Sequence, residues 1–262
     1  MALALSLSAG AQMGTATGGA PGSTPSGAPN QNDTAASAKA MTDRAVELYD
    51  THKDAEALAL FRRAAGIGGV DAMMYLGVMY GSGRGTAVDY ASALSWFRQA
   101  AEAGNAQAMC NIGVLYLQGR GILKNYAQAM SWFRKASEAG NTEAMFNVGV
   151  LLRDGLGVPV NYPEALRWFR RAAGQGDVPA ANAIGVLYQQ GLGVETDYAE
   201  AMKWYQNAAE AGSDAAMFNI GTLYENGLGV DRDVTQALAW YRKASAAGSE
   251  PARAALKSLG DK

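Results

Sequence analysis

The sequence predicts an all-α fold built as a stack of antiparallel helix pairs. The first observation is a period of 36 residues that runs from residue 70 to residue 249 without insertion or deletion. The second is that each period holds two segments with the helical spacing of apolar residues. The third is a Gly-x-Gly pair between these segments, where the chain must reverse direction. The five tryptophans of the chain follow the same period: Trp96, Trp132, Trp168, Trp204 and Trp240.

Composition excludes several classes of function. The 262 residues are 49% hydrophobic, which is enough to fill a core, and the formal net charge is −2. Because so small a charge gives no field that would draw the chain to nucleic acid or to an anionic bilayer, we expect no nucleic-acid partner. With one cysteine (Cys110) and one histidine (His52), an intramolecular disulfide is impossible and a His-rich metal site is not expected. We therefore expect no metal, no cofactor and no catalytic residues.

Residues 1–40 differ from the rest of the chain. Ala, Gly, Ser, Thr and Pro dominate, and only Asp33 and Lys39 are charged, so we interpret this segment as a flexible leader or linker. Residues 2–12 are similar to the end of a secretory signal, with small residues at Ala9 and Ala11, although no positively charged segment precedes them. This predicts a periplasmic or secreted protein; an Ala-rich arm on a cytoplasmic protein is the alternative. No apolar run approaches the roughly 20 residues of a membrane span.

Residues 142–177 show one period in detail. The first helix, helix A, carries small or apolar residues at i, i+3, i+4 and i+7: Met145, Val148, Gly149 and Leu152. Residues 154–157 then end this helix. The second, helix B, follows Pro163 with the same spacing: Ala165, Trp168, Phe169 and Ala172. Gly176 supplies the usual C-terminal glycine.

A glycine lies in the middle of every helix A: Gly77, Gly113, Gly149, Gly185 and Gly221. Glycine there costs about 1 kcal/mol relative to alanine, so five of them cost roughly 5 kcal/mol, comparable with the net stability of a domain. The sequence therefore predicts a close approach, in which the aromatic pair of helix B, Trp168 and Phe169 in this period, packs against the backbone of helix A. A single helix pair would expose much of its apolar stripe to water, so successive helix pairs must stack on one another.

These residues resemble a known family. The pattern A-x-x-x-x-G-V-L-Y-x-x-G-x-G occurs at Ala180 to Gly193, and Y-x-x-A-x-x-W-Y/F follows at Tyr198 to Tyr205. From residue 70 to residue 249 the chain is similar to Sel-one-like repeats, relatives of tetratricopeptide repeats with a longer loop. The resemblance implies a right-handed superhelical solenoid of antiparallel helix pairs. Leu152 and Val234 replace the tyrosines of the other periods, which leaves the predicted fold unchanged.

Four segments follow from the period and the resemblance. Residues 1–40 are the leader, residues 41–69 a tetratricopeptide-like N-terminal cap with a shortened loop, residues 70–249 the five repeats, and residues 250–262 a C-terminal capping helix. The cap has counterparts of helix B residues 36 positions earlier, including Phe61 and Ala64, but no Gly-x-Gly loop. The last helix carries polar residues, as suits a terminal repeat.

The resemblance implies that helices A line a concave side whose outward residues meet a partner. The expected partner-binding residues are Asn111, Phe146, Asn147, Asn182, Phe218 and Asn219. An asparagine amide offers both the donor and the acceptor that an extended peptide needs, and a phenylalanine could seat an apolar side chain. The alternative is that the asparagines bond neighbouring helices and the phenylalanines are partly buried packing. The sequence leaves both open.

The resemblance implies a non-catalytic protein–protein interaction scaffold that binds a peptide or partner protein in the concave groove. It implies a regulatory or assembly role in a bacterial envelope or in host interaction. An envelope structural protein or peptidoglycan-associated spacer is the first alternative. A β-lactam hydrolase is a weaker one, because this chain lacks the paired cysteines of the relatives linked to that activity and has no Ser-x-x-Lys motif in a plausible site. No sequence feature indicates an oligomeric state.

Overall fold

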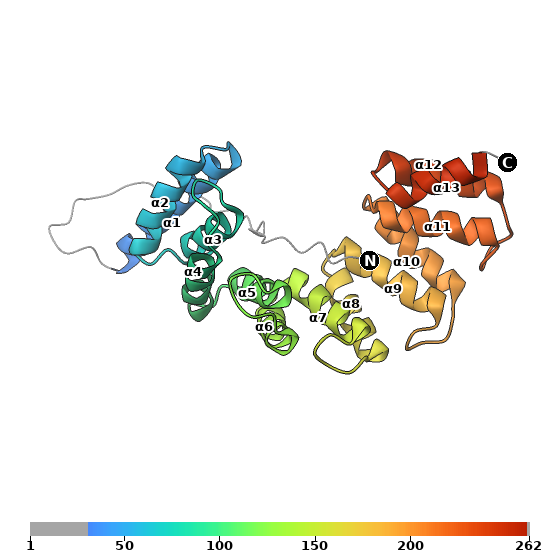
Figure 1. Ribbon diagram of the computed structural model, residues 1–262, viewed down its shortest axis with the longest axis horizontal. Helices are drawn as coiled ribbons and strands as arrows, with labels where there is room; N and C mark the ends of the chain where they lie inside the picture. Colours follow the sequence, from blue (N-terminus) through green and yellow to red (C-terminus); the bar gives the residue numbers. More distant parts are fainter. Residues whose placement is uncertain (1–30, 261–262) are drawn as a thin grey trace. The chain divides into compact units, whose positions relative to one another are not determined.

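The computed structural model describes residues 31–260, and this part of the chain forms thirteen α-helices and no strand (Figure 1). The helices are α1 (Gln31–Asp50), α2 (Asp54–Gly66), α3 (Val70–Ser82), α4 (Tyr90–Glu102), α5 (Ala106–Gln118), α6 (Tyr126–Glu138), α7 (Thr142–Asp154), α8 (Tyr162–Ala173), α9 (Val178–Gln190), α10 (Tyr198–Glu210), α11 (Asp214–Asn226), α12 (Val234–Ala246) and α13 (Glu250–Gly260). They belong to two compact units, the first ending at Asn141 and the second beginning at Thr142. The predicted all-α fold is confirmed.

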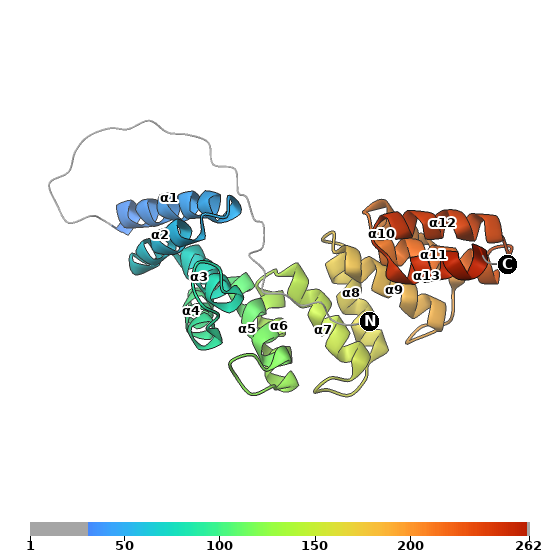
Figure 2. The ribbon, with the colours of Figure 1, turned by 45° about the horizontal axis from the view of Figure 1, so that its top comes forward.

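Each 36-residue period holds one helix pair. Helices A are α3, α5, α7, α9 and α11, and helices B are α4, α6, α8, α10 and α12. The two members of a pair pack against each other, and within each unit a helix B also packs against the helix A that follows it (Figure 2). The pair α1 and α2 precedes α3, and α13 packs against α12. This is the predicted stack of helix pairs.

Helix α1 begins at Gln31, within the range that the sequence assigned to the leader. Alanine, the strongest helix former, recurs from residue 35 onward, and Asp33 in the first turn favours the positive end of the helix dipole. Ala38 and Thr42 are buried, and Ala45 belongs to a core cluster shared with α2 and α3. Packing on one face thus stabilises a segment whose composition resembles a linker. The signal-like residues 2–12 lie outside the described residues.

The helix A glycines lie against aromatic rings of helix B. A Cβ atom built on each glycine would lie only 2.4–2.6 Å from the nearest ring carbon, a distance that real Cβ atoms do not show. The glycine and ring partners are Gly77 with Phe97, Gly113 with Phe133, Gly149 with Phe169, Gly185 with Tyr205, and Gly221 with Tyr241. All five aromatic residues are at most 1% exposed. The predicted close approach is confirmed for the second residue of each aromatic pair.

The tryptophans have a different role from the one predicted. Trp96 of α4 packs against a core cluster drawn from α1, α2 and α3, and Trp240 of α12 packs against a cluster drawn from α9, α10 and α11. Both are only partly buried. The Phe or Tyr therefore closes its own helix pair, whereas the Trp extends the contact to the preceding pair. The two aromatic residues have different roles because the helix pairs stack, and the sequence of one period does not show this stacking.

Two of the rings carry hydroxyl groups with partners in the same repeat. Tyr205 donates to Oε1 of Gln189 at 2.6 Å, and Tyr241 donates to Oε2 of Glu225 at 2.5 Å. Burial raises the pKa of both tyrosines above the ordinary value, so both stay protonated donors. The hydrogen bond holds the outer end of each ring in position beside helix A of the same repeat.

The Gly-x-Gly loops join helix A to helix B within each repeat and also contact the preceding repeat. The first glycine ends helix A in the left-handed conformation, as at Gly191 with φ of 66°. The second glycine lies against the start of the preceding helix B: a Cβ atom on Gly193 would lie 2.6 Å from Cβ of Tyr162. Gly121 has the same relation to Tyr90, and Gly229 to Tyr198. The loop therefore needs glycine both for its backbone conformation and for close contact with its neighbour.

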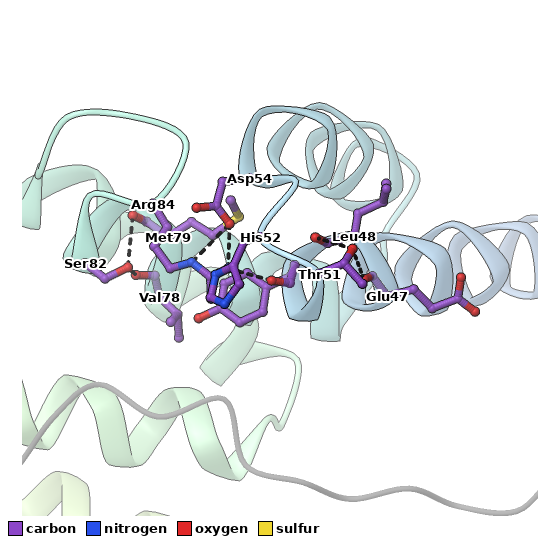
Figure 3. A network of polar contacts seen from close by, with 10 residues as sticks. Glu47, Leu48, Thr51, His52, Asp54, Val78, Met79, Ser82 and Arg84 are labelled. Carbon is purple, nitrogen blue, oxygen red and sulfur yellow. Dashed lines mark hydrogen bonds and ion pairs between the residues drawn. The ribbon is translucent and has the colours of Figure 1, made fainter.

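In the first repeat this loop also holds the N-terminal pair in place (Figure 3). Arg84, between the two glycines, pairs with Asp54 at 2.5 Å and donates to the backbone carbonyl of Tyr49 at 2.5 Å. Its guanidinium also lies 3.5 Å from the centroid of the Tyr49 ring. Beside them, His52 has a φ of 58°, the only positive φ of a non-glycine residue within residues 31–260. Arg84 thus joins α1, α2 and the loop that follows α3.

We predict that Gly185→Ala lowers the free energy of unfolding by about 2 kcal/mol, despite the better helix propensity of alanine, because overpacking a filled core costs more than that gain. The ring cannot swing away without breaking the bond between Tyr205 and Gln189. Urea unfolding followed by circular dichroism measures the change.

The matched control is Gly66→Ala at the end of α2, where a Cβ atom would meet nothing within 4 Å. Stability should be unchanged there or higher by up to about 1 kcal/mol. Equal effects of the two substitutions would contradict the packing explanation.

Candidate partner-binding face

The fifth and ninth residues of each helix A form one strip along the helix, here called the A strip. Its members are Met74 and Val78 (α3), Cys110 and Val114 (α5), Phe146 and Val150 (α7), Asn182 and Val186 (α9), and Phe218 and Thr222 (α11). Spacing of four residues places the two members of each helix on one face, one turn apart. Three of the predicted partner-binding residues belong to the A strip: Phe146, Asn182 and Phe218.

The A strip differs between the two units. In the first unit all four members are buried, with at most 3% exposure. In the second unit Phe146, Val186, Phe218 and Thr222 are partly exposed. A partner can therefore reach apolar side chains of helices A in the second unit, where the helices are α7, α9 and α11. We call these four residues the accessible strip.

Three of the predicted site residues do not point outward. Asn111, Asn147 and Asn182 are buried, with at most 1% exposure, so their amides do not reach the surface of the protein in this structure. Whether the predicted set binds a partner is not tested by this burial and stays a prediction.

The asparagines do not form a repeated ladder. Asn219 donates through Nδ2 to Oδ1 of Asn182 at 2.9 Å, which joins α11 to α9. Asn111 lies near Gln107, one turn earlier on the same helix. Both amide atoms of Asn147 are buried without a hydrogen-bond partner among residues 31–260. The bond between Asn182 and Asn219 is of the kind that the structural alternative describes, because it joins neighbouring helices.

Phe146 and Phe218 are partly buried, and each packs on an aromatic ring of helix B. Phe146 packs on Phe169 with ring centroids 5.6 Å apart, and Phe218 packs on Tyr241 at 5.3 Å. Each therefore lies on the ring that contacts the helix A glycine of its own repeat. Because this support fixes one side of each phenylalanine, its exposed side is a firm apolar surface.

Helices A also meet at their N-terminal edge. In the first unit the residue that caps one helix A bonds the preceding helix A: Nδ2 of Asn105 donates to Asp71 at 2.9 Å, and Nδ2 of Asn141 donates to Gln107 at 2.8 Å. In the second unit the equivalent positions hold two carboxylates, Asp177 and Glu143. An amide-to-carboxylate bond is therefore replaced by like charges.

The pKa of Asp177 is raised above its ordinary value, chiefly because burial penalises the charged form and further because of the negative charge of Glu143. Its hydrogen bond from the backbone N–H of Ala180, at 2.7 Å, acts in the opposite direction. Asp214 adds a third carboxylate at the start of α11. The N-terminal edge of α7, α9 and α11, hereafter the acidic edge, consists of Glu143, Asp177 and Asp214.

Charge is unevenly divided between the two kinds of helix in the second unit. The residues of α7, α9 and α11 include four carboxylates and one guanidinium, Arg153, which pairs with Asp154 at 2.6 Å. The residues of α8, α10 and α12 include six cations and three carboxylates. Helices A are thus net acidic and helices B net basic. Aligning the five periods position by position would have revealed the acidic edge, which the search for outward side chains missed.

The thiol of Cys110 is buried, and residues 31–260 contain no group of three or more His, Cys, Asp and Glu side chains that could hold a metal ion. Among the same residues, no helix combines the length and the apolar character that crossing a bilayer requires.

Helix pairs of fixed length, stacked through glycine and aromatic contacts, define a tetratricopeptide-related helical repeat protein. The family model described as Sel1 repeat matches five consecutive segments, residues 70–105, 106–141, 142–177, 178–213 and 214–249. The chain belongs to the Sel1 repeat family. The resemblance drawn from the sequence patterns is confirmed.

Solved structures agree with this assignment. A Sel1 repeat protein from Oxalobacter formigenes is 34% identical, with 84% of this chain and 90% of that chain covered and a TM-score of 0.79. A protective antigen present in uropathogenic Escherichia coli strains, displaying an SLR fold, is 32% identical with a TM-score of 0.74. There the match covers 88% of this chain and 51% of the antigen. The comparison with curated proteins finds no match.

We predict that Asp177→Asn raises the free energy of unfolding by about 1 kcal/mol at neutral pH, because an amide can donate to Glu143 as Asn105 donates to Asp71. The folded protein holds a proton on Asp177 more tightly than the unfolded chain does. The contribution of Asp177 to the free energy of unfolding is therefore lost as the pH rises through its folded-state pKa. The gain should therefore disappear in acid. Urea unfolding over a range of pH measures it.

The reciprocal control is Asn105→Asp, which would create the same like-charged pair with Asp71. This substitution should lower the free energy of unfolding at neutral pH, and the loss should disappear in acid. If Asp177→Asn destabilises the protein at neutral pH, repulsion at the acidic edge is not significant.

Proposed function

We propose that this protein is a non-catalytic scaffold that binds a peptide segment of a partner protein on the A face of its second unit. The Sel1 repeat fold is typical of protein–protein interaction scaffolds, and proteins of this kind are generally non-catalytic. The observation that carries the proposal is the accessible strip, whose apolar side chains remain partly exposed although the equivalent residues of the first unit are buried. Partly exposed aromatic side chains on a rigid support are favourable anchors for a partner.

The strip suits an extended segment better than a globular surface. The bond between Asn219 of α11 and Asn182 of α9 shows that these two helices A are neighbours. At a spacing of about 10 Å between neighbouring helices, crossing from α7 over α9 to α11 spans roughly 20 Å, or about six residues of extended chain. Such a segment would place one apolar side chain on Phe146 and another on Phe218. The amide pair of Asn182 and Asn219 lies between them and satisfies itself, so it imposes no unmet hydrogen bond on the partner.

We predict that the paired substitution Val186→Gln and Thr222→Gln weakens partner binding by about ten-fold or more, because it replaces two compact side chains, the apolar one of Val186 among them, with longer and flexible polar chains. Both positions are partly exposed, so the fold should persist, which circular dichroism checks. The measurement is affinity for a partner captured with the full chain and identified by mass spectrometry.

The control pair is Lys203→Gln and Arg242→Gln on helices B, which introduces the same residue on the other kind of helix. It should leave affinity within about two-fold, as expected for exposed side chains outside an interface. Equal losses from both pairs would argue against the A face.

We also propose a role in the bacterial envelope or in host interaction, with the mature chain exported. The signal-like residues 2–12 and the similarity to a protective antigen of uropathogenic Escherichia coli support this proposal. An envelope spacer remains the alternative, and peptidoglycan pull-down separates it from a scaffold. N-terminal sequencing of the mature protein should show cleavage after a small residue near position 11. An intact N-terminus on a cytoplasmic protein would refute export.

A further inference from the structure

The acidic edge and the accessible strip lie on the same helices, which restricts the chemistry of a partner. Glu143 precedes Phe146 by three residues on α7, and Asp214 precedes Phe218 by four on α11. One helical turn rises about 5.4 Å, so a carboxylate and an aromatic side chain lie within reach of one extended peptide at both ends of the strip. Each apolar anchor therefore has an acidic group beside it on the same face.

The same helices offer almost no positive charge. Their one cation, Arg153, lies in the last turn of α7, at the opposite end from the acidic edge, and is engaged by Asp154. The cations of the second unit are concentrated on helices B instead. A peptide that carried acidic side chains would consequently meet like charge on the A face, whereas a basic peptide would meet complementary charge.

We infer that the partner segment is a basic peptide, with lysine or arginine side chains adjacent to apolar side chains about six positions apart. This inference rests on the proposed function and specifies its ligand. A cation placed between Glu143 and Asp177 relieves the repulsion that the fold builds into that pair, so the attraction is stronger there than at an isolated surface carboxylate. The apolar side chains supply the contact with Phe146 and Phe218.

Binding to the acidic edge should also act on Asp177 itself. Burial and the charge of Glu143 raise the pKa of Asp177, and a bound cation would lower it again. Binding of a basic peptide is therefore expected to weaken in acid, where Asp177 becomes protonated and the acidic edge loses negative charge. This pH dependence distinguishes attraction at the edge from apolar contact alone.

Three fluorescein-labelled synthetic peptides of about twelve residues test the inference by fluorescence anisotropy against the full chain. The first carries two leucines six positions apart and a lysine two positions after each, in a Ser/Thr background. The second has glutamates in place of the lysines, and the third has serines in place of the leucines. We expect the first to bind at least about ten-fold more tightly than either of the others at low salt, with a preference over the glutamate peptide that falls as salt rises.

The edge variant is Glu143→Gln with Asp177→Asn, and its matched control is Glu195→Gln with Asp231→Asn. Both remove two negative charges, but Glu195 and Asp231 are exposed in the loops at the other end of helices A. The edge variant should lose the preference for lysine over glutamate, and the control should keep it. Loss of the preference in both variants, tighter binding of the glutamate peptide, or no binding of the lysine peptide would overturn the inference.

The proposed function fails in a different way. If the glutamate peptide binds best and Val186→Gln with Thr222→Gln still weakens it, the A face is a docking surface and only the charge of the partner was wrongly inferred. If no peptide depends on Val186 and Thr222, and a captured natural partner does not depend on them either, the docking surface itself is wrong.

Discussion

The contact between a helix A glycine and a buried aromatic ring of helix B is the constraint on which the rest of the structure depends. It brings the two helices of a pair closer than any side chain at that position would permit, and it recurs at the same place in all five repeats. Because glycine weakens a helix intrinsically, this contact must be held by tertiary packing and cannot arise from local propensity. The glycine and the aromatic residue recur every 36 residues because every repeat needs this contact.

Three contacts of different range then build the stack outward from this one. The ring closes a pair, the tryptophan beside it extends the core to the preceding pair, and the second glycine of the loop lies against the start of the preceding helix B. Each contact involves only a repeat and its neighbour. The exposed face of helices A takes no part in these three contacts. Side chains on that face can therefore differ between repeats while the fold stays constant.

The fold was predictable because its information is local and repeated. Spacing of apolar residues defined both helices, and the mid-helix glycines indicated close packing. The direction of Asn182 and Asn219 was not predictable in the same way, because they bond across two repeats and a single helical period does not show which side meets a neighbour. The acidic pair of Asp177 and Glu143, 34 residues apart, was missed for the same reason. The start of α1 was missed because its alanine-rich sequence also suits a linker.

Polar contacts within one repeat and polar contacts between repeats respond differently when a repeat is duplicated. Tyr205 and Gln189 are 16 residues apart within one repeat, so duplication of that repeat copies both members together and the core survives intact. Asn182 and Asn219 belong to successive repeats, so insertion of a copy between them separates the pair and confronts each with a new neighbour. Gene duplication in this architecture therefore preserves the polar contacts within a repeat while changing those between neighbouring helices A, so successive repeats can diverge in sequence at little risk to folding.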